Sequence, residues 1–496
     1  MSCGNPAVEG TDAVMQRKPK YDKSRICVKC KENLGKIVVR HAVYCKDCFF
    51  PFMSFKFRRS LEPFVNAKPD GPRKTALKPT GDILVGFSGG LGSSVLLDLI
   101  HRSYVSPNLV QTNPEGGRDH PRKDRVWKNV NICYVEVSDA FTQMKDNTED
   151  IRHSIERYKG LEFTPLRAQD AFDPSWWAKT DREFDLSHMG VDLTSEDLLL
   201  SSISQGSSPK DSLRKYLSSL PTDTARSTAL QTITRLLIYH TAHRLGCSHI
   251  VLGTCLTSLA VSLISSISQG GGFHVKEEIQ EEWAPHSTQE VKSTRSHTND
   301  IRIIRPLRDV GMKECAAWAW WNRVTVVGRE SWEWTGSKPG IGKLTKDFIF
   351  GLEKDYPSTV STIVRTCGKL APKGEVSGQC LLCSRPIQQG VQEWKTRISI
   401  RSHNTDDSTP SDSVATALTP YLCYTCHTTL TSRSPRTAQD NPTNVPLPMW
   451  ATSTHTTSFT SDALGVNKDD DIEVFVGKRT TEEQMHNIVK GFLLDE

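Results

Sequence analysis

Four Cys-x-x-Cys pairs carry the clearest chemical signal in this sequence of 496 residues. The pairs are Cys27/Cys30, Cys45/Cys48, Cys380/Cys383 and Cys423/Cys426. Fourteen residues separate the first two pairs, and 39 separate the last two. A tetrahedral Zn²⁺ ion takes four thiolates, and a two-residue spacer lets one tight turn present two of them. We therefore predict two zinc sites; sulfur ligands alone also suit an iron–sulfur cluster, but ribbon-like pairs favour zinc.

Basic and aromatic side chains surround the first two cysteine pairs. Residues 16–80 hold 17 Lys and Arg against 5 Asp and Glu, whereas the rest of the chain holds 45 against 52. Such interleaving suits phosphates and unstacked bases, although the alternative is a solvated surface whose five phenylalanines over 49–57 pack the module onto the main domain. We assign packing to most phenylalanines and RNA contact to the basic side chains. The RNA-binding candidates are Lys29, Lys31, Lys36, Arg40, Lys46, Lys56, Arg58 and Arg59.

A glycine- and serine-rich loop follows an apolar run over 83–87, and a helix is expected to begin near Ser93. Glycines let the backbone approach phosphate oxygens, and a helix N-terminus offers free N–H groups and a favourable dipole. No Gly-Lys-Ser/Thr follows, so the loop is not a Walker A motif; an ordinary strand-to-helix turn is the alternative. The candidate nucleotide-binding residues are Ser88, Gly89, Gly90, Ser93 and Ser94.

Strand-like and helix-like segments alternate around this loop between residues 81 and 330. This alternation predicts an α/β domain with a parallel sheet, whose ligands bind at the carboxyl ends of the strands. The expected strands lie at 83–87, 130–137, 249–252 and 301–307, and the expected helices at 229–247, 256–268 and 310–321.

Composition divides the rest of the chain. No apolar run of 18 residues exists, so we expect no membrane span, and no signal peptide follows Met1. Fourteen cysteines without such a signal favour metal chemistry in the cytoplasm over disulfides. The expected units are a disordered tail (1–24), a zinc ribbon (25–60), the α/β domain (81–355) with insertions near 102–124, 185–226 and 275–300, a second zinc-binding module (375–430), a disordered linker (431–470) and a C-terminal part (471–496) with a helix over 480–494.

The glycine loop resembles the PP-loop, Ser-Gly-Gly-x-Asp-Ser, of the ATP-pyrophosphatase superfamily. Together, the ribbon, this loop and the distant cysteine pairs resemble the cytoplasmic tRNA 2-thiolation protein 2 family. The resemblance covers residues 25–100, 229–321, 375–430 and 480–496. It implies a PP-loop, adenine nucleotide alpha hydrolase-like fold, and it makes tRNA the RNA that the basic residues contact.

The catalytic features of the sister family are missing at the matching positions. Gly92 replaces the Asp of the loop, Ser227-Thr228-Ala229-Leu230 replaces a Cys-x-x-Cys pair, and no cysteine occurs over 324–336. Gly253-Thr254-Cys255-Leu256-Thr257-Ser258 replaces Gly-His-Asn-Ala-Asp-Asp. Cys255 is the cysteine best placed near the pocket, and we interpret it as a small buried residue. The chain is therefore expected to have no catalytic residue, and whether it binds ATP and Mg²⁺ stays open.

The resemblance implies a non-catalytic subunit that pairs with a catalytic PP-loop tRNA thiolase in a heterodimer. That complex would take sulfur from a thiocarboxylated ubiquitin-related modifier and place it at C2 of the wobble uridine in the tRNAs for Lys, Glu and Gln. Two alternatives remain at this point: an autonomous ATP-dependent tRNA sulfurtransferase that uses Cys255, and a zinc-ribbon interaction hub without an RNA role.

Overall fold

The computed structural model describes thirteen segments of the chain. They are residues 25–40, 42–66, 77–106, 126–141, 144–180, 188–195, 197–203, 207–279, 301–328, 340–370, 376–391, 417–431 and 444–452. The expected tail over 1–24, most of the insertions expected near 102–124 and 275–300, and the helix expected over 480–494 lie outside the described residues.

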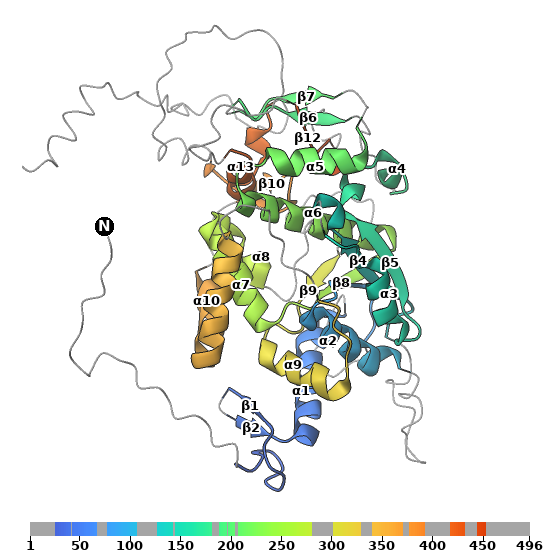
Figure 1. Ribbon diagram of the computed structural model, residues 1–496, viewed down its shortest axis with the longest axis vertical. Coiled ribbons are helices and arrows are strands. Elements are labelled where there is room, and N and C mark those ends of the chain that lie inside the picture. Colours follow the sequence, from blue (N-terminus) through green and yellow to red (C-terminus); the bar gives the residue numbers. More distant parts are fainter. Residues whose placement is uncertain are drawn as a thin grey trace, which may run out of the picture.

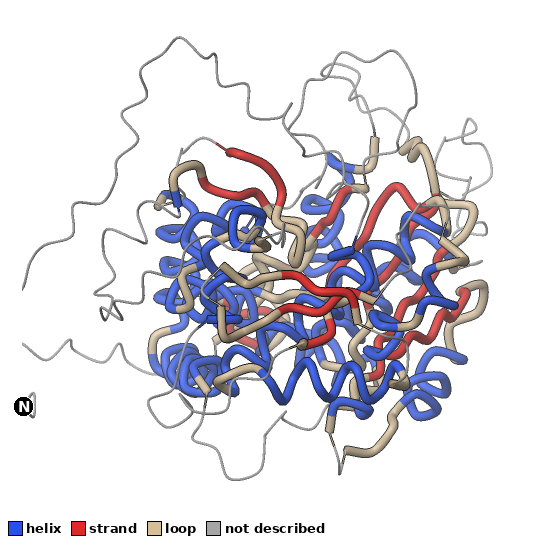
Figure 2. The backbone as a smooth tube through the Cα atoms, turned by 90° about the horizontal axis from the view of Figure 1, so that it is seen from above, coloured by secondary structure: helices blue, strands red, loops and turns tan. Residues whose placement is uncertain are grey.

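Five parallel strands form the central sheet (Figures 1 and 2). In spatial order they are β5 (Glu162–Arg167), β4 (Val130–Glu136), β3 (Asp82–Gly86), β8 (Cys247–Leu252) and β9 (Arg302–Ile304). The first of these strands along the chain, β3, lies in the middle, with β4 on one side and β8 on the other. The chain thus extends the sheet to one edge and then crosses to the other, which creates a switch point where such sheets bind ligands. The expected α/β fold with a parallel sheet is confirmed.

Strand β5 is the one strand of this sheet that the sequence pattern missed. Its central position is Pro165, which cannot donate a backbone hydrogen bond to a ladder. Proline is tolerated here because β5 lies at the edge of the sheet and pairs only with β4. The other four strands coincide with expected segments.

The helices and the shorter strands complete the described fold. The α-helices are α1 (Lys46–Leu61), α2 (Leu91–Ile100), α3 (Thr148–Glu156), α4 (Pro174–Trp177), α5 (Pro209–Ser219), α6 (Asp223–Arg244), α7 (Leu256–Ser268), α8 (Val275–Ile279), α9 (Met312–Asn322), α10 (Ile341–Asp355), α11 (Pro357–Lys369) and α13 (Tyr424–Thr431). The short strands are β1 (Ile37–Val39), β2 (Ala42–Tyr44), β6 (Met189–Val191), β7 (Leu200–Ser202), β10 (Val376–Gln379), β11 (Pro386–Gln388) and β12 (Val445–Pro446).

The two faces of the sheet belong to two different apolar cores, because successive strand residues point to opposite sides. Leu84 and Ile250 join a core that α6 covers. Val85 and Val251 join a second core that α1, α2 and α9 cover. The sheet is therefore shielded on both faces, and its carboxyl-end edge is left to present functional groups.

Helix limits follow local capping. Helix α7 has the limits that the sequence predicts. Helix α6 begins six residues before position 229, because the Thr222 hydroxyl accepts a hydrogen bond from the backbone N–H of Ala225 at 3.1 Å. Helix α2 begins at Leu91, two residues before Ser93, with Gly90 as its N-cap. None of the helices in the described part of the chain has both the length and the apolar character that a bilayer crossing demands.

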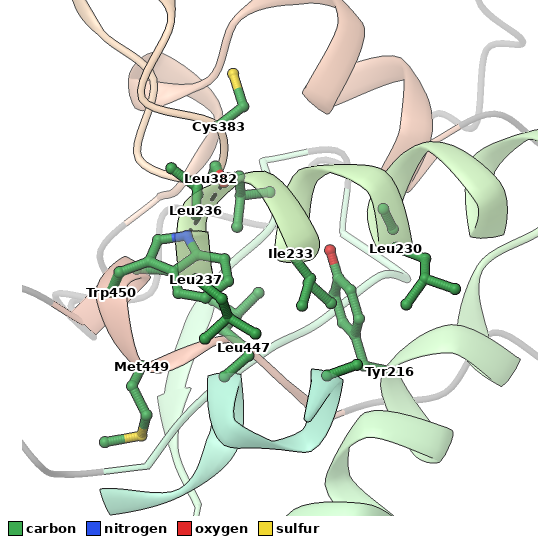
Figure 3. Close-up of a cluster of buried hydrophobic side chains, with 14 of the residues drawn as sticks. Tyr216, Leu230, Ile233, Leu236, Leu237, Leu382, Cys383, Leu447, Met449 and Trp450 are labelled. Atoms are coloured by element: carbon green, nitrogen blue, oxygen red, sulfur yellow. Dashed lines mark hydrogen bonds between the residues drawn. The ribbon is translucent and has the colours of Figure 1, made fainter. Parts of the chain in front are cut away.

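Two polar stretches contain more packed structure than their composition suggests. The stretch 185–226 holds β6, β7 and α5, and Leu213 of α5 is fully buried. Disorder is expected across 431–470, but residues 444–452 pack against the main domain. There the Trp450 indole N–H donates to the carbonyl of Leu382 at 3.1 Å, and Leu447 is buried beside it (Figure 3). The expectation of disorder is wrong for these nine residues, since a short apolar run was hidden within Ser- and Thr-rich sequence.

Candidate metal centres and the glycine loop

The first two cysteine pairs meet at the end of the molecule formed by the β1–β2 hairpin and α1 (Figure 1). Cys27 and Cys30 lie on a tight turn that the N–H of Lys31 closes onto the carbonyl of Cys27 at 2.9 Å. Cys45 is the N-cap of α1, and Cys48 lies in its first turn. The four sulfur atoms all lie within 4.8 Å of one another.

The last two cysteine pairs meet at the opposite end of the molecule (Figure 1). The β10–β11 hairpin carries Cys380 and Cys383, and α13 begins directly after Cys423 and contains Cys426. Their four sulfur atoms also lie within 4.8 Å of one another. Residues 392–416 lie between the two pairs and outside the described residues. The two pairs meet although 39 residues separate them in the sequence. This is tolerable because the entropic cost of closing a loop grows only slowly with its length.

Both groups have the spacing of ligands that share one ion. The Cys30 and Cys45 sulfurs are 3.8 Å apart, and the Cys383 and Cys423 sulfurs are 3.6 Å apart. A tetrahedron with Zn–S bonds of about 2.3 Å places its sulfurs roughly 3.8 Å apart. A four-iron cluster would put each sulfur on a different iron and so needs a wider arrangement. The geometry of the donor atoms therefore fits a single tetrahedral ion at each end.

The glycine loop is held by its own hydroxyl groups. Ser93 donates to the carbonyl of Gly90 at 2.9 Å and accepts from the N–H of Ser88 at 3.3 Å. Gly89 has a φ of +73°, which favours glycine, and its carbonyl accepts from the N–H of Gly328 at 3.1 Å. The neighbouring Ser94 hydroxyl is buried without a hydrogen-bond partner among the described residues. The loop is thus closed by its own hydroxyl groups, and residues 327 and 328 lie against it.

Two glycine backbones touch where the PP-loop carries its acid. A Cβ atom on Gly92 would lie 2.2 Å from the carbonyl oxygen of Gly253. A Cβ atom on Gly253 would lie 2.5 Å from the Cα of Ser93. Both distances are far inside van der Waals contact, so neither position accepts a side chain. The carboxylate is therefore not merely absent from position 92: the packing of the loop against the end of β8 excludes it.

Comparison with known proteins finds a matching family model and similar curated sequences. A family model described as cytoplasmic tRNA 2-thiolation protein 2 matches residues 340–428, from α10 into α13. A protein of that name from Phaeosphaeria nodorum is 27% identical over 424 residues, which cover 83% of this chain and 96% of the relative. The Bos taurus protein of that name is 26% identical over 428 residues, which cover 80% of this chain and 79% of the relative. Over about four fifths of its length, this chain is similar to curated proteins named cytoplasmic tRNA 2-thiolation protein 2.

A solved structure is also similar to this chain. The U34-tRNA thiolase NcsA from Methanococcus maripaludis, solved with its [4Fe-4S] cluster, superposes with a TM-score of 0.44 at 16% sequence identity. The superposition covers 77% of this chain and 99% of that chain.

Arginines and a glutamate connect the C-terminal cysteine group to the central sheet. Arg385 forms an ion pair with Glu278, and Arg235 of α6 donates to the carbonyl of Cys383. Arg305, just after β9, is buried and donates to the carbonyl of Glu277 at 3.3 Å. Burial by itself raises the pKa of Glu278, but the three arginines outweigh it and lower that pKa to about 2.

The charges of this cluster balance only if the cysteine group is counted. Three guanidinium groups face one carboxylate, which leaves an excess of two positive charges among Arg235, Arg305, Arg385 and Glu278. Four thiolates around a divalent ion carry two negative charges. A buried charge is tolerated when it is paired, so the arginines match the charge of a filled tetrathiolate site. Sequence reasoning missed them because they lie on α6, after β9 and on the β10–β11 hairpin.

Positions where the resemblance led us to expect acids and thiols have structural roles in this chain. The Thr257 hydroxyl donates to Glu353 of α10 at 2.7 Å and accepts from the N–H of Met312 at 3.0 Å. Ala229 and Leu230 of α6, in the stretch 227–230 that replaces the sister family's Cys-x-x-Cys pair, lie in the apolar core. These side chains therefore join helices to one another.

Cys255 lies where the sequence places it, at the N-terminus of α7, and is 2% exposed. A hydrogen bond from the Cys315 thiol of α9 lowers its pKa to about 7 against the opposing effect of burial, and the Ser258 hydroxyl lies 3.3 Å from its sulfur. The sequence offered no signal for Cys315, which comes 60 positions later. The Cys255 thiol is enclosed by the second core, which indicates a packing role.

Replacing Cys255 with alanine should therefore leave tRNA thiolation unchanged and destabilise the fold by only about 1–2 kcal/mol, because a small buried group is lost. Quantification of 2-thiouridine in cells that carry the variant checks this. A variant that is folded but abolishes thiolation would restore Cys255 as a reactive thiol.

The candidate RNA-binding residues divide by exposure. Six of them are exposed: Lys29, Lys31, Lys36, Arg40, Lys46 and Arg59. The Lys56 ammonium instead forms a 2.9 Å ion pair with Glu314 and donates to the carbonyl of Asp309 at 3.2 Å. Arg58 is half-buried on the same helix. Lys56 thus fastens α1 to α9, and of the aromatic residues Phe49 and Phe57 are fully buried, as expected for packing.

Proposed function

We propose that this chain is the non-catalytic subunit of a cytoplasmic complex that 2-thiolates the wobble uridine of tRNA. Similarity to proteins named cytoplasmic tRNA 2-thiolation protein 2 supports the pathway and the compartment. We further propose that the substrates are the tRNAs for Lys, Glu and Gln. In this proposal the partner is a catalytic PP-loop thiolase in a heterodimer, and the sulfur comes from a thiocarboxylated ubiquitin-related modifier.

The contact between Gly92 and Gly253 carries the non-catalytic assignment. The reaction requires adenylation of the uridine O2 and displacement of AMP by sulfur, so it needs acidic groups at the nucleotide and a reactive thiol. In this chain position 92 has no space for an acid, Thr257 joins two helices, and Cys255 is enclosed. We assign uridine activation and sulfur transfer to the partner, and we propose that this chain does not turn over ATP.

We propose Zn²⁺ at both cysteine groups, held by Cys27, Cys30, Cys45 and Cys48 at one end and by Cys380, Cys383, Cys423 and Cys426 at the other. The ions would stabilise the turns and hairpins of the two small modules. The N-terminal ion would fix the turn that presents Lys29 and Lys31. The C-terminal ion would anchor α13 to α6.

We propose that the exposed basic residues of the N-terminal module bind the tRNA backbone. Replacing Lys36 with glutamine should weaken tRNA binding and reduce the slope of log affinity against log salt by about one, because one phosphate contact is lost. Filter binding or anisotropy over a salt series measures both. Lys354→Gln on α10, another exposed lysine, is the control and should change neither. A slope that Lys36→Gln leaves unaltered would contradict the phosphate contact.

The pathway assignment is tested by deleting the gene and measuring modified nucleosides of bulk tRNA by mass spectrometry. Loss of 2-thiouridine, restored by the wild-type gene, is the expected result. Unchanged 2-thiouridine would remove the assignment and leave the interaction hub as the function. ATP–pyrophosphate exchange by the purified chain would instead support the autonomous sulfurtransferase.

A further inference from the structure

An open groove of about 630 Å³ runs along the N-terminal module, beside the first cysteine group and away from the glycine loop. The turn that carries the first cysteine pair forms one side, β2 contributes Tyr44, and α1 forms the other side. The lining residues are Val28, Lys29, Tyr44, Pro51, Phe52 and Phe55.

One aromatic face of this groove is open to solvent. Phe55 is 62% exposed, and Val28 on the cysteine turn is 58% exposed. Phe52 differs, because it stacks on Tyr44 with ring centroids 4.8 Å apart, and the Lys56 ammonium lies 4.9 Å from its ring centre. The protein itself thus occupies the faces of Phe52, whereas Phe55 presents a planar apolar surface that no packing requirement explains.

Cations border this apolar surface. Lys29 lines the groove, and Lys31, Lys36 and Lys46 are exposed on the same small module. Residues 25–61 hold nine Lys and Arg and only two acidic residues, Glu32 and Asp47. A planar apolar platform with a basic border complements a ligand that joins flat rings to phosphates, which is the chemistry of a single-stranded nucleic acid.

We propose that an unstacked base of single-stranded RNA lies in this groove against Phe55, with its flanking phosphates on Lys29 and the neighbouring lysines. The inference rests on the proposed tRNA binding by this module and adds a base contact to it. Every base offers a π-face to an aromatic side chain, so the contact requires an unpaired nucleotide and not a particular sequence. Bases in a helical stem are paired and stacked, so the groove selects a loop or an end of the RNA.

The test uses the full-length protein and two probes: a short oligouridylate, and an oligomer of the same length and charge whose riboses lack bases. Phe55→Ala should weaken oligouridylate binding about five- to tenfold, the lower part of the range for loss of one base–aromatic stack. It should leave the affinity for the base-free oligomer and the salt slope unchanged, because no phosphate contact is removed. Phe55→Trp should retain tight binding.

Phe348→Ala is the matched control, because Phe348 on α10 is 58% exposed and lies outside the N-terminal module. It should alter neither affinity. Equal oligouridylate affinities of Phe55→Ala and wild type would overturn the proposal. So would a Phe55→Ala variant that loses only co-purification with the catalytic thiolase, since a protein partner would then occupy the groove. Loss of 2-thiouridine on gene deletion decides the proposed function separately, so the base contact can fail while that function stands.

Discussion

Replacing Arg385 with leucine is expected to destabilise the C-terminal cysteine group by about 3–5 kcal/mol, the usual effect of breaking a buried ion pair from one side. The substitution leaves Glu278, which is 9% exposed, without its direct partner. It also removes a positive charge that faces Cys383 and Cys423. The ion at this end should then be lost to a chelator before the ion at the other end, where the surrounding lysines are exposed.

Chemical denaturation and the metal-to-protein ratio during chelator titration measure these effects. The doubly substituted chain, Arg385→Leu with Glu278→Gln, should recover part of the stability, because no unpaired carboxylate remains. Arg59→Leu, at an exposed position of α1, is the control and should leave both ions in place. Wild-type stability of Arg385→Leu with two retained ions would show that the arginine cluster does not balance the charge of the site.

Introducing an acid into the glycine loop by Gly92→Asp should destabilise the fold and should not restore catalytic activity. The new Cβ would lie 2.2 Å from the Gly253 carbonyl, so the loop or the end of β8 must move. Overpacking together with an unpaired buried carboxylate should destabilise the protein by about 3 kcal/mol or more. ATP–pyrophosphate exchange should stay at background, and 2-thiouridine in cells should fall as the subunit unfolds.

Gly342→Asp provides the matched control, because a Cβ there meets nothing within 4 Å and the position lies in the first turn of α10. A carboxylate at a helix N-terminus is neutral to favourable. Thermal unfolding of the two variants separates the effect of the site from that of an added acid. If Gly92→Asp folded as well as Gly342→Asp and gained pyrophosphate exchange, the loop would lack only its acid and the exclusion argument would be wrong.

Local patterns were sufficient for much of the architecture. The sequence predicted four strands, the limits of α7 and the position of the glycine loop, because apolar periodicity and glycine placement act over a few residues. Strand β5 was hidden by Pro165, whose acceptance depends on lying at the edge of the sheet. The packed stretch 444–452 was hidden because composition averages over a window longer than the apolar run that Trp450 anchors.

The sequence by itself determined the cysteine pairs, the basic N-terminal module and the loss of acids and thiols, because each is a matter of residue type and short spacing. Only the tertiary structure decided that Gly92 abuts Gly253, that Arg235 and Arg385 converge on one cysteine group, that Lys56 pairs with Glu314 of α9 and that Phe55 stays exposed. The contacts of Gly92, Arg235 and Lys56 join residues that the chain keeps more than 140 positions apart, and the exposure of Phe55 depends on which surfaces the packing leaves uncovered. Their energies depend on how complete elements fit together, which no local spacing encodes.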